Sequence, residues 1–422
     1  MPPAEPVGAP RRVVKAFSRV IQRRAREAAR AFRGLPPLLP ALSALTLDED
    51  DADIARRWLA EGTRWRDASV TEEYERDFAS RLGFGRAYAF EGGRVALGAC
   101  LRALGLKPGD EVIVPGYTCV VVFNAFLFAG VRAVPADIEL ETFGLDASGL
   151  DAKLTPRTRA VLLHHLFGLV CRDYEKTLAW ARSKGLKVIE DCAHSAGAEH
   201  QGVKAGKRGD LAFFSSERSK VYNTFMGGIA ATDDERLAHE LEALRDASPL
   251  PDEDETRRRL RTLLLDFLEL KGGDRWKRDL SDLLHGHERA ATITPEELRG
   301  LAPPGYGRRM PPPLAAIGLN QLRKMDAYNA LRRTNALRWD RFCGSSGYRK
   351  PLVVPGSIPV FLSYPVLVEP QKRADASWAS AVLGVEPGTW FTNDFHPSPW
   401  RAAQDCPNAV EAHSRCVFFP TL

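Results

Sequence analysis

Short apolar runs alternate with helix-like stretches through the middle of this 422-residue chain, and no other feature constrains its fold as strongly. The runs lie at 112–114, 160–163, 187–189 and 211–214. Helix-like segments such as 94–104 and 174–184 fall between them. This order predicts an α/β fold, with a mostly parallel sheet and helices on both faces. A helix-like segment at 314–340 should then lead into a smaller C-terminal α+β domain.

Lys220 follows the predicted strand at 211–214 and precedes the Gly227-Gly228 pair. A lysine that leaves a strand end inside a protein has its charge disfavoured by desolvation, which makes the amine a better nucleophile. Such lysines form Schiff bases with carbonyl compounds, including pyridoxal phosphate. From this segment alone, a surface lysine is an equally good interpretation.

Asp191 ends the predicted strand at 186–190. Open α/β sheets place ligand groups at the carboxyl ends of their strands, and a carboxylate there can keep a pyridinium nitrogen protonated. A helix cap or a turn is the alternative role for such an aspartate.

Gly92 and Gly93 precede the helix-like segment at 94–104. Glycines at a helix start allow a phosphate to approach the backbone amides, where the helix dipole favours an anion. Arg94 can add a guanidinium contact and Ser215 a hydroxyl. The alternative for a Gly-Gly pair is a simple turn.

From about residue 47 to its C-terminus, the chain resembles the DegT/DnrJ/StrS family of pyridoxal-phosphate-dependent sugar aminotransferases. The matching motifs are EYERDFASRLG (73–83), GDEVIVPGYT (109–118), VPAD (134–137), HLFG (165–168), EDCAHSAG (190–197), FSSERSK (214–220), MGG (226–228), LAAIGLNQL (314–322), CPNA (406–409) and FP (419–420). The resemblance implies the type I aspartate-aminotransferase-like fold, with a mostly parallel seven-stranded sheet between helices.

The resemblance also implies roles for individual residues. Lys220 would hold the cofactor covalently and move the substrate proton, and Asp191 would pair with the pyridine nitrogen. His194 stands where the family usually has Gln, near the phenolic oxygen of the cofactor. The residues implied for the phosphate and for the rest of the cofactor are Gly93, Arg94, Val95, Ser215 and Cys119. His165 either lines the site or supports it from behind.

Several positions depart from the family pattern. Arg94 replaces a small hydroxyl residue, and Cys119 stands where many members place an aromatic ring over the cofactor. At the position of Gly307, the family usually has an Asn that reaches the cofactor phosphate bound in the partner subunit. Gly307 cannot make that contact, so either Arg308 or Arg309 substitutes for the Asn or the contact is lost. Together with Lys324, these two arginines are the candidate cations for a substrate diphosphate.

Two segments lie outside the family pattern. Residues 1–46 contain a basic amphipathic stretch at 11–33, with nine basic residues and one acidic residue, followed by a Pro-rich linker. This stretch could be a solvated or dimer-packing arm, or it could attach to an anionic membrane surface. The second segment is a predicted helical insertion at 248–299, within a large domain at 47–313 and before a small domain at 314–422.

Composition limits the partners and the location. The net charge of +5 argues against nucleic-acid binding, because the excess of basic residues lies in the N-terminal arm. Seven cysteines without metal-ligand spacing suit a reduced cytoplasm and predict no metal site. No apolar run is long enough to span a bilayer, and the N-terminus lacks the apolar region of a signal peptide.

The sequence thus predicts a cytoplasmic, homodimeric aminotransferase, with peripheral attachment to the inner face of the membrane as one alternative for residues 11–33. It would move an amino group from glutamate to a nucleotide-linked keto sugar, giving an aminodeoxy sugar for surface polysaccharide, lipopolysaccharide or a glycosylated metabolite. Two alternatives stay open: a non-catalytic paralogue that binds cofactor or sugar in a regulatory or scaffold role, and a membrane-associated aminotransferase with a lipid-linked substrate.

Overall fold

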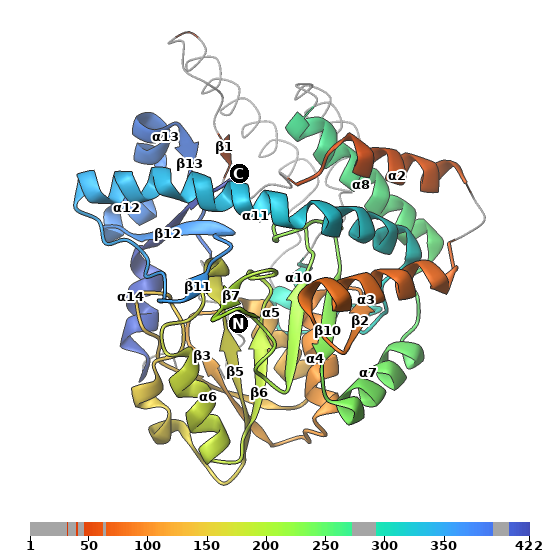
Figure 1. The fold of residues 1–422 in the computed structure, drawn as a ribbon, viewed down its shortest axis with the longest axis horizontal. Coiled ribbons are helices and arrows are strands. Elements are labelled where there is room, and N and C mark those ends of the chain that lie inside the picture. Colours follow the sequence, from red (N-terminus) through yellow and green to blue (C-terminus); the bar gives the residue numbers. More distant parts are fainter. Residues whose placement is uncertain (1–31, 33–38, 41–45, 62–64, 272–292, 391–404) are drawn as a thin grey trace, which may run out of the picture.

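The computed structural model describes residues 32, 39–40, 46–61, 65–271, 293–390 and 405–422 (Figure 1). Its centre is a seven-stranded sheet in the order β2-β10-β9-β6-β5-β3-β4. The strands are β2 Arg86–Phe90, β3 Glu111–Pro115, β4 Arg132–Ala136, β5 Thr158–His164, β6 Lys187–Asp191, β9 Leu211–Ser215 and β10 Gly228–Thr232. Four neighbouring pairs are parallel, and β10 is antiparallel to both β9 and β2. The predicted mostly parallel, seven-stranded sheet is therefore confirmed.

Helices cover both faces of the sheet, which is why its strands read as continuous apolar runs. One face packs against α4 Gly93–Ala103, α5 Val120–Phe128 and α7 Glu235–Ala247. The other packs against α3 Ala68–Leu82 and α6 Tyr174–Ser183, while α2 Glu49–Ala60 and α8 Glu253–Lys271 pack on each other and join the same hydrophobic core as α3. Strand β9 shows the alternation, because Phe213 belongs to the first core and Phe214 to the second.

A single long helix, α11 Pro312–Ser346, extends from the α3 side of the sheet to the C-terminal elements (Figure 1). It is longer at both ends than the predicted 314–340, and it ends where Gly347 adopts a positive φ of 73°. Its far half packs on the antiparallel pair β12 Ser363–Leu367 and β14 Cys416–Pro420. There the indole of Trp339 donates to the carbonyl of Pro420 at 2.7 Å and stacks on Phe419.

The remaining elements are short. They are β1 Leu39–Pro40, β7 Glu199–His200, β8 Val203–Lys204, β11 Ser357–Ile358, β13 Val385–Glu386, α10 Pro295–Leu298, α12 Pro370–Ala374, α13 Ser377–Leu383 and α14 Pro407–Arg415. Because α11 packs at one end on α3 and at the other on β14, the boundary at 313/314 stays a prediction.

Two predicted segments fall partly outside the described residues. The amphipathic stretch at 11–33 lies outside them except for Phe32, and so does the Gly-Gly break at 272–273. Within the described part of the insertion, α8 lies beside α2, where the Arg257 side chain donates to the carbonyl of Leu59 at 3.3 Å. Among the described helices, none has both the length and the apolar character needed to cross a membrane.

The contact between α11 and α3 gives a stability prediction. A Cβ added to Gly318 would lie 2.5 Å from the ring of Tyr74, whose hydroxyl is held by Tyr222 at 3.0 Å. Because this ring is buried and fixed, Gly318→Ala should lower the free energy of unfolding by about 1–3 kcal/mol in urea titrations.

Gly344 on the same helix is the matched control. The nearest atom to an added Cβ there is Lys350 Cε at 4.0 Å, so Gly344→Ala should be neutral or stabilise by about 0.5–1 kcal/mol. Equal effects of the two substitutions would contradict the close packing of α11 on α3.

Candidate functional site

The carboxyl ends of three neighbouring strands bring the predicted site residues to one edge of the sheet. His164, which ends β5, is paired with Asp191, which ends β6, and Asp191 is paired with Phe213 of β9. His165 and Ser215 follow at the same edge. Sites in open α/β sheets form at this edge, so the structure brings together residues from three separate sequence motifs.

Lys220 lies in the loop between β9 and β10, and its Nζ is 2.9 Å from Nε2 of the buried His194. The other ring nitrogen of His194, Nδ1, accepts a hydrogen bond from the backbone amide of Phe167 at 3.2 Å. The neutral imidazole therefore carries its proton on Nε2, the ring nitrogen that faces Lys220 Nζ.

Burial lowers the pKa of His194 well below its ordinary value, and the neighbouring Lys220 lowers it further. His194 is therefore neutral at physiological pH. From the sequence alone, a histidine beside such a site suggests an imidazole that titrates near neutral pH, and the buried, neutral His194 differs from that expectation.

Trp390 was not anticipated from the sequence, although it covers this pair. Its ring lies 4.4 Å from that of His194, and the Lys220 amine is 5.6 Å from its centre. The ring also stacks on Phe167 at 5.3 Å and packs on Phe418 at 4.2 Å. No local sequence signal marks Trp390, because it reaches the site only through the folding of the C-terminal segment over the sheet edge.

Asp191 is a buried carboxyl with unused hydrogen-bonding capacity. Burial raises its pKa to about 6, against the opposing effects of the Ala193 amide, Lys220 and His165. Among the described residues, the hydrogen bond to its side chain comes from that amide, to Oδ1 at 3.0 Å. Oδ2 therefore remains available for a cationic N–H donor.

Glu190, directly before Asp191, is a fully buried carboxylate that accepts five hydrogen bonds. His165 Nε2 at 2.9 Å, the Tyr174 hydroxyl at 2.8 Å and the Gly206 amide at 2.8 Å donate to Oε2. The amides of Arg208 and Gly209 donate to Oε1. Burial alone would raise the pKa of Glu190, but these donors, His165 first among them, hold it below its ordinary value.

The Glu190 contacts show how His165 is placed. Its side chain is fully buried and points to Glu190, while its backbone amide donates to the carbonyl of Asp191 at 3.1 Å. Of its two predicted positions, this geometry favours support behind the site over the site wall.

The glycine turn before α4 packs against strands β9 and β10. A Cβ on Gly93 would lie 2.9 Å from that of Ser215, and one on Gly228 would lie 2.4 Å from the carbonyl carbon of Gly92. Only glycine fits at these contacts. The N-terminus of α4 and the Ser215 hydroxyl therefore lie together, an arrangement that suits an anion. Val95 is buried in the first turn of α4.

Arg94 and Cys119 flank this region. The Arg94 guanidinium forms an ion pair with the buried Glu297 of α10. Cys119 directly precedes α5. Burial raises the pKa of its thiol; the charges of Lys220 and Arg94 lower that pKa, and the charge of Asp191 raises it. Cys119 therefore lies close to the predicted site residues.

The three cations predicted for a substrate diphosphate lie in different surroundings. Arg308 is paired with Glu255 of α8. Lys324 is held by three carboxylates near α2, those of Asp48, Asp50 and Asp51.

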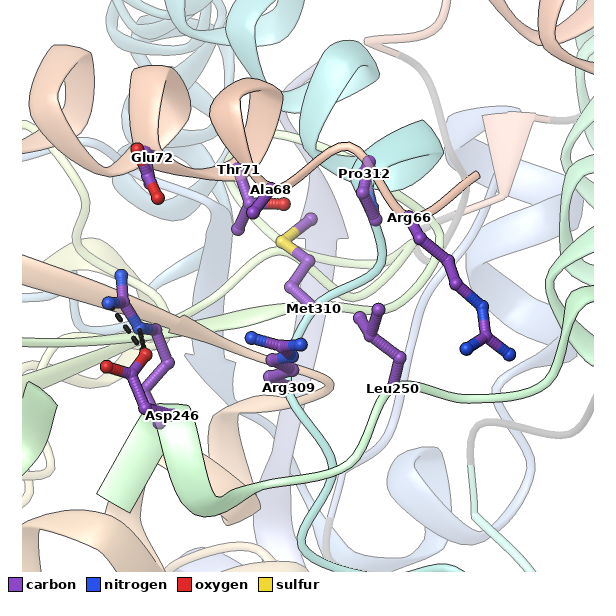
Figure 2. Close-up of a pocket in the computed structure, with 10 residues that line it drawn as sticks. Arg66, Ala68, Thr71, Glu72, Asp246, Leu250, Arg309, Met310 and Pro312 are labelled. Carbon is purple, nitrogen blue, oxygen red and sulfur yellow. Dashed lines mark hydrogen bonds and ion pairs between the residues drawn. The ribbon is translucent and has the colours of Figure 1, made fainter. Parts of the chain in front are cut away.

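Arg309 instead lines a separate pocket between α3 and the end of α7 (Figure 2). Figure 2 shows its side chain between Leu250 and Asp246, below Met310. The residues lining this pocket are Arg66, Ala68, Thr71, Glu72, Arg245, Asp246, Leu250, Arg309, Met310 and Pro312.

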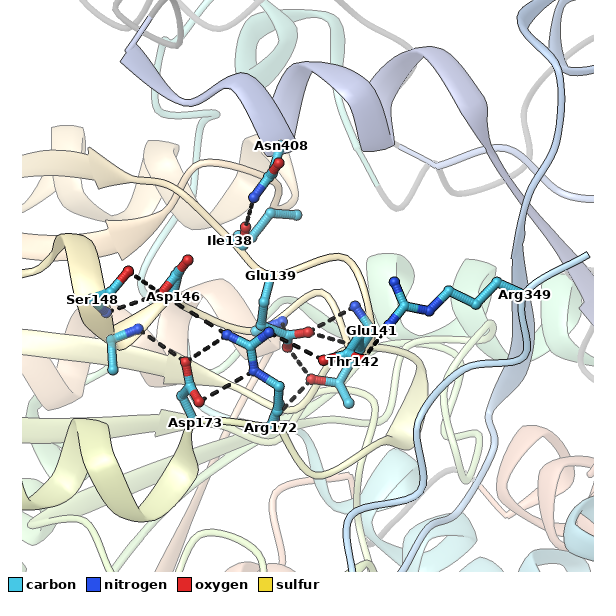
Figure 3. A network of polar contacts seen from close by, with 12 residues as sticks. Ile138, Glu139, Glu141, Thr142, Asp146, Ser148, Arg172, Asp173, Arg349 and Asn408 are labelled. Carbon is cyan, nitrogen blue, oxygen red and sulfur yellow. Dashed lines mark hydrogen bonds and ion pairs between the residues drawn. The ribbon is translucent and has the colours of Figure 1, made fainter.

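A polar network behind β5 supports the same edge of the sheet (Figure 3). Glu139 accepts from the amides of Glu141, Thr142 and Gly144 and so closes a tight turn. Within that turn, the carbonyl of Phe143 accepts from His164 Nε2 at 2.6 Å. Burial lowers the pKa of His164 to about 4, so this residue is a neutral structural donor.

A model of the DegT/DnrJ/EryC1/StrS aminotransferase family matches residues 46–422. Solved structures share the fold. One is DesV of S. venezuelae, with a TM-score of 0.69 at 24% identity over 91% of this chain and 93% of that one. Another is 3-amino-5-hydroxybenzoic acid synthase, with a TM-score of 0.67 at 22% identity over 91% of this chain and 93% of that one.

Curated relatives match parts of the chain. The GDP-perosamine synthase of Caulobacter vibrioides is 42% identical over 173 residues, which are 41% of this chain and 46% of the relative. The L-glutamine:2-deoxy-scyllo-inosose aminotransferase of Streptoalloteichus tenebrarius is 33% identical over 310 residues, 71% of this chain and 63% of the relative. The chain thus spans about half to two thirds of the length of these relatives.

The Glu190 contacts predict a pH-dependent contribution to stability. Because the pKa of Glu190 is lower in the folded protein, its carboxylate stabilises the fold above about pH 4.5 and loses this effect as pH falls through the folded pKa. Glu190→Gln should therefore lower the free energy of unfolding by about 1–3 kcal/mol at pH 7, because an amide cannot accept all five donors.

Urea titrations at pH 7 and pH 4 would measure this difference, which should shrink at the lower pH. Glu199→Gln is the control, since Glu199 pairs with Lys204 at the surface and should change stability by less than about 1 kcal/mol. A Glu190→Gln effect that is the same at both pH values would contradict a charged Glu190.

Proposed function

The chain belongs to the DegT/DnrJ/EryC1/StrS aminotransferase family, and from this premise we propose that it is a pyridoxal-phosphate-dependent sugar aminotransferase. One observation carries the proposal. The Lys220 amine is held by a neutral, buried histidine at the sheet edge where Asp191 presents a carboxyl oxygen. A surface lysine would have neither partner.

The residues present fit the proposed cofactor. Lys220 offers the amine for the aldehyde carbon, and Asp191 Oδ2 offers an acceptor for a protonated ring nitrogen. The start of α4, with Gly93 against Ser215, suits the phosphate group. When bound, pyridoxal phosphate supplies a ring that withdraws electrons from the substrate carbon next to the nitrogen.

The side chains of the protein would then hold that carbon and move its proton. Lys220 Nζ would take the proton from the carbon of the amino donor and later deliver one to the carbon of the ketone acceptor. His194 Nε2 would keep Nζ oriented, and the Phe167 amide fixes the His194 tautomer. Trp390 and Phe167 cover the pair and exclude water. Cys119 leaves room over the cofactor, because it is small where an aromatic ring would stack.

Names of curated relatives support a sugar or cyclitol ketone as the amine acceptor. They include the GDP-perosamine synthase and the scyllo-inosose aminotransferase above. A further one is a UDP-N-acetyl-3-dehydro-alpha-D-glucosamine 3-aminotransferase of Acidithiobacillus ferrooxidans, 37% identical over 172 residues. For this chain we propose a nucleotide-linked keto sugar, with glutamate as donor, to give an aminodeoxy sugar for a surface polysaccharide or a glycosylated metabolite.

We further propose a cytoplasmic homodimer, with residues 11–33 as a peripheral contact to the membrane surface. Arg309 remains a candidate for the substrate diphosphate, since its side chain lines a pocket and forms no ion pair with the residues that the structure describes. The Lys220–His194 and Asp191 arrangement favours the enzyme over a non-catalytic binding paralogue, because binding alone does not require an oriented amine.

Absorbance spectra of the purified protein test this proposal. Wild type with pyridoxal phosphate should show the band of a lysine-bound cofactor, and glutamate should convert it to the amino form. Lys220→Ala should show neither, while Lys107→Ala, at an exposed lysine, should behave as wild type. Cofactor binding with no response to glutamate, glutamine or other amino donors would favour the binding paralogue.

The neutral state of His194 gives a second test. Because burial and Lys220 lower the pKa of His194 well below its ordinary value, it should not titrate near pH 6.5. The acid limb of the kcat/KM profile should therefore have the same midpoint in wild type and in His194→Gln, even if the rate falls. An acid limb near pH 6.5 that is lost in His194→Gln would show instead that His194 titrates.

A further inference from the structure

Two ion pairs flank the Gly92-Gly93 turn, and both are completed by residues of the 248–299 segment. Glu91, directly before the turn, accepts from the Arg259 guanidinium of α8. Arg94, directly after it, donates to Glu297 of α10. The side chains on both sides of the glycine turn are thus held by residues of α8 and α10.

Both pairs are buried. The exposed fractions of the side chains are 4% for Arg259 and 9% for Glu91, and 13% for Arg94 and 2% for Glu297. Removal of one partner from such a pair leaves a charge without compensation in a medium of low dielectric. The segment and the turn are therefore coupled far more strongly than by surface ion pairs.

Further contacts fix the two partners in the segment. Arg259 also binds Glu255 at 2.6 Å, one turn earlier in α8. At α10, the capping box of Thr294 and Glu297 closes the first turn, and Asn124 of α5 donates to the carbonyl of Glu297 at 2.7 Å. Arg308 joins the network, since it pairs with Glu255 and its carbonyl accepts from the Glu91 amide at 3.0 Å.

Arg259 also has hydrogen-bonding capacity to spare. Its Nη2 serves both carboxylates, while its Nη1 is buried without a hydrogen-bond partner among the residues that the structure describes. An unsatisfied guanidinium donor in the interior is costly unless a ligand completes it. Through Nη2, this guanidinium lies beside Glu91, the residue that precedes the turn.

We propose that α8 and α10 act as a clamp on the phosphate-binding turn, with Arg259 and Glu297 as positioning residues for the cofactor phosphate. The inference rests on the proposed function, because it takes that phosphate as the anion at the start of α4. The clamp holds the residues on both sides of the turn and so keeps its amides aligned.

The test compares two ligands that differ only in the phosphate group. Pyridoxal phosphate and pyridoxal are each titrated into cofactor-free protein, with the absorbance of the lysine-bound form as the signal. Arg259→Met and Glu297→Gln should each raise the Kd for pyridoxal phosphate at least about tenfold and leave the Kd for pyridoxal within about twofold of wild type. Arg259→Lys should recover part of the affinity and, because it keeps a cation opposite Glu91, should also fold.

Matched controls lie next to each residue. Arg258→Met on α8 and Glu296→Gln on α10 change more exposed neighbours and should leave both Kd values as in wild type. Thermal unfolding of each apo-variant reports whether it is folded.

The outcomes separate the inference from the proposed function. Unchanged affinity for pyridoxal phosphate in the two variants, or an equal loss for both ligands in a folded variant, would overturn the clamp while leaving the aminotransferase proposal intact. Failure of the wild-type protein to bind either ligand would overturn the proposed function and, with it, the clamp.

Discussion

The buried Glu190 carboxylate is the interaction on which the rest of the site depends. It accepts from His165 after β5, from Tyr174 of α6 and from the amides at 206, 208 and 209 that lead into β9. One charged group thus fixes the ends of three strands, and Asp191 follows it directly. A charge in the interior is stable only when its lone pairs are satisfied, so the same requirement that keeps Glu190 ionised also holds the sheet edge in one geometry.

The charged groups around the site fall into two classes with different consequences. Glu190 is satisfied by neutral donors and by His165, and it belongs to the sheet itself. Glu91, Arg94, Arg259 and Glu297 instead satisfy one another across the gap between the sheet and the 248–299 segment. Because these four side chains are at most 13% exposed, α8 and α10 cannot separate from the glycine turn without leaving charges uncompensated, which couples both helices to the turn.

Local patterns in the sequence predicted the elements that position the site. The apolar runs at 112–114, 160–163, 187–189 and 211–214 each became a strand of the parallel part of the sheet, because strands covered on both faces need apolar side chains at every position. The helix at 314–340 was placed correctly but extends to Pro312 and Ser346, since packing on β12 and β14 supports turns that local pattern does not mark. The neutral, donor state of His194 was missed, because it depends on the Phe167 amide and on burial.

By itself, the sequence determined the sheet, the family, and the lysine and aspartate at the edge of the sheet. The spacing of apolar residues, the turn residues and the order of the motifs can all be read along the chain without knowing which distant residues meet. Only the tertiary structure decided which partners those residues meet. Trp390 lies over Lys220, Glu297 binds Arg94 and Glu255 binds Arg308, each across more than fifty residues of chain. Such contacts are set by the packing of whole helices and strands. Burial in that packing then sets the protonation state and the orientation of each side chain, and neither is a property of the residue alone.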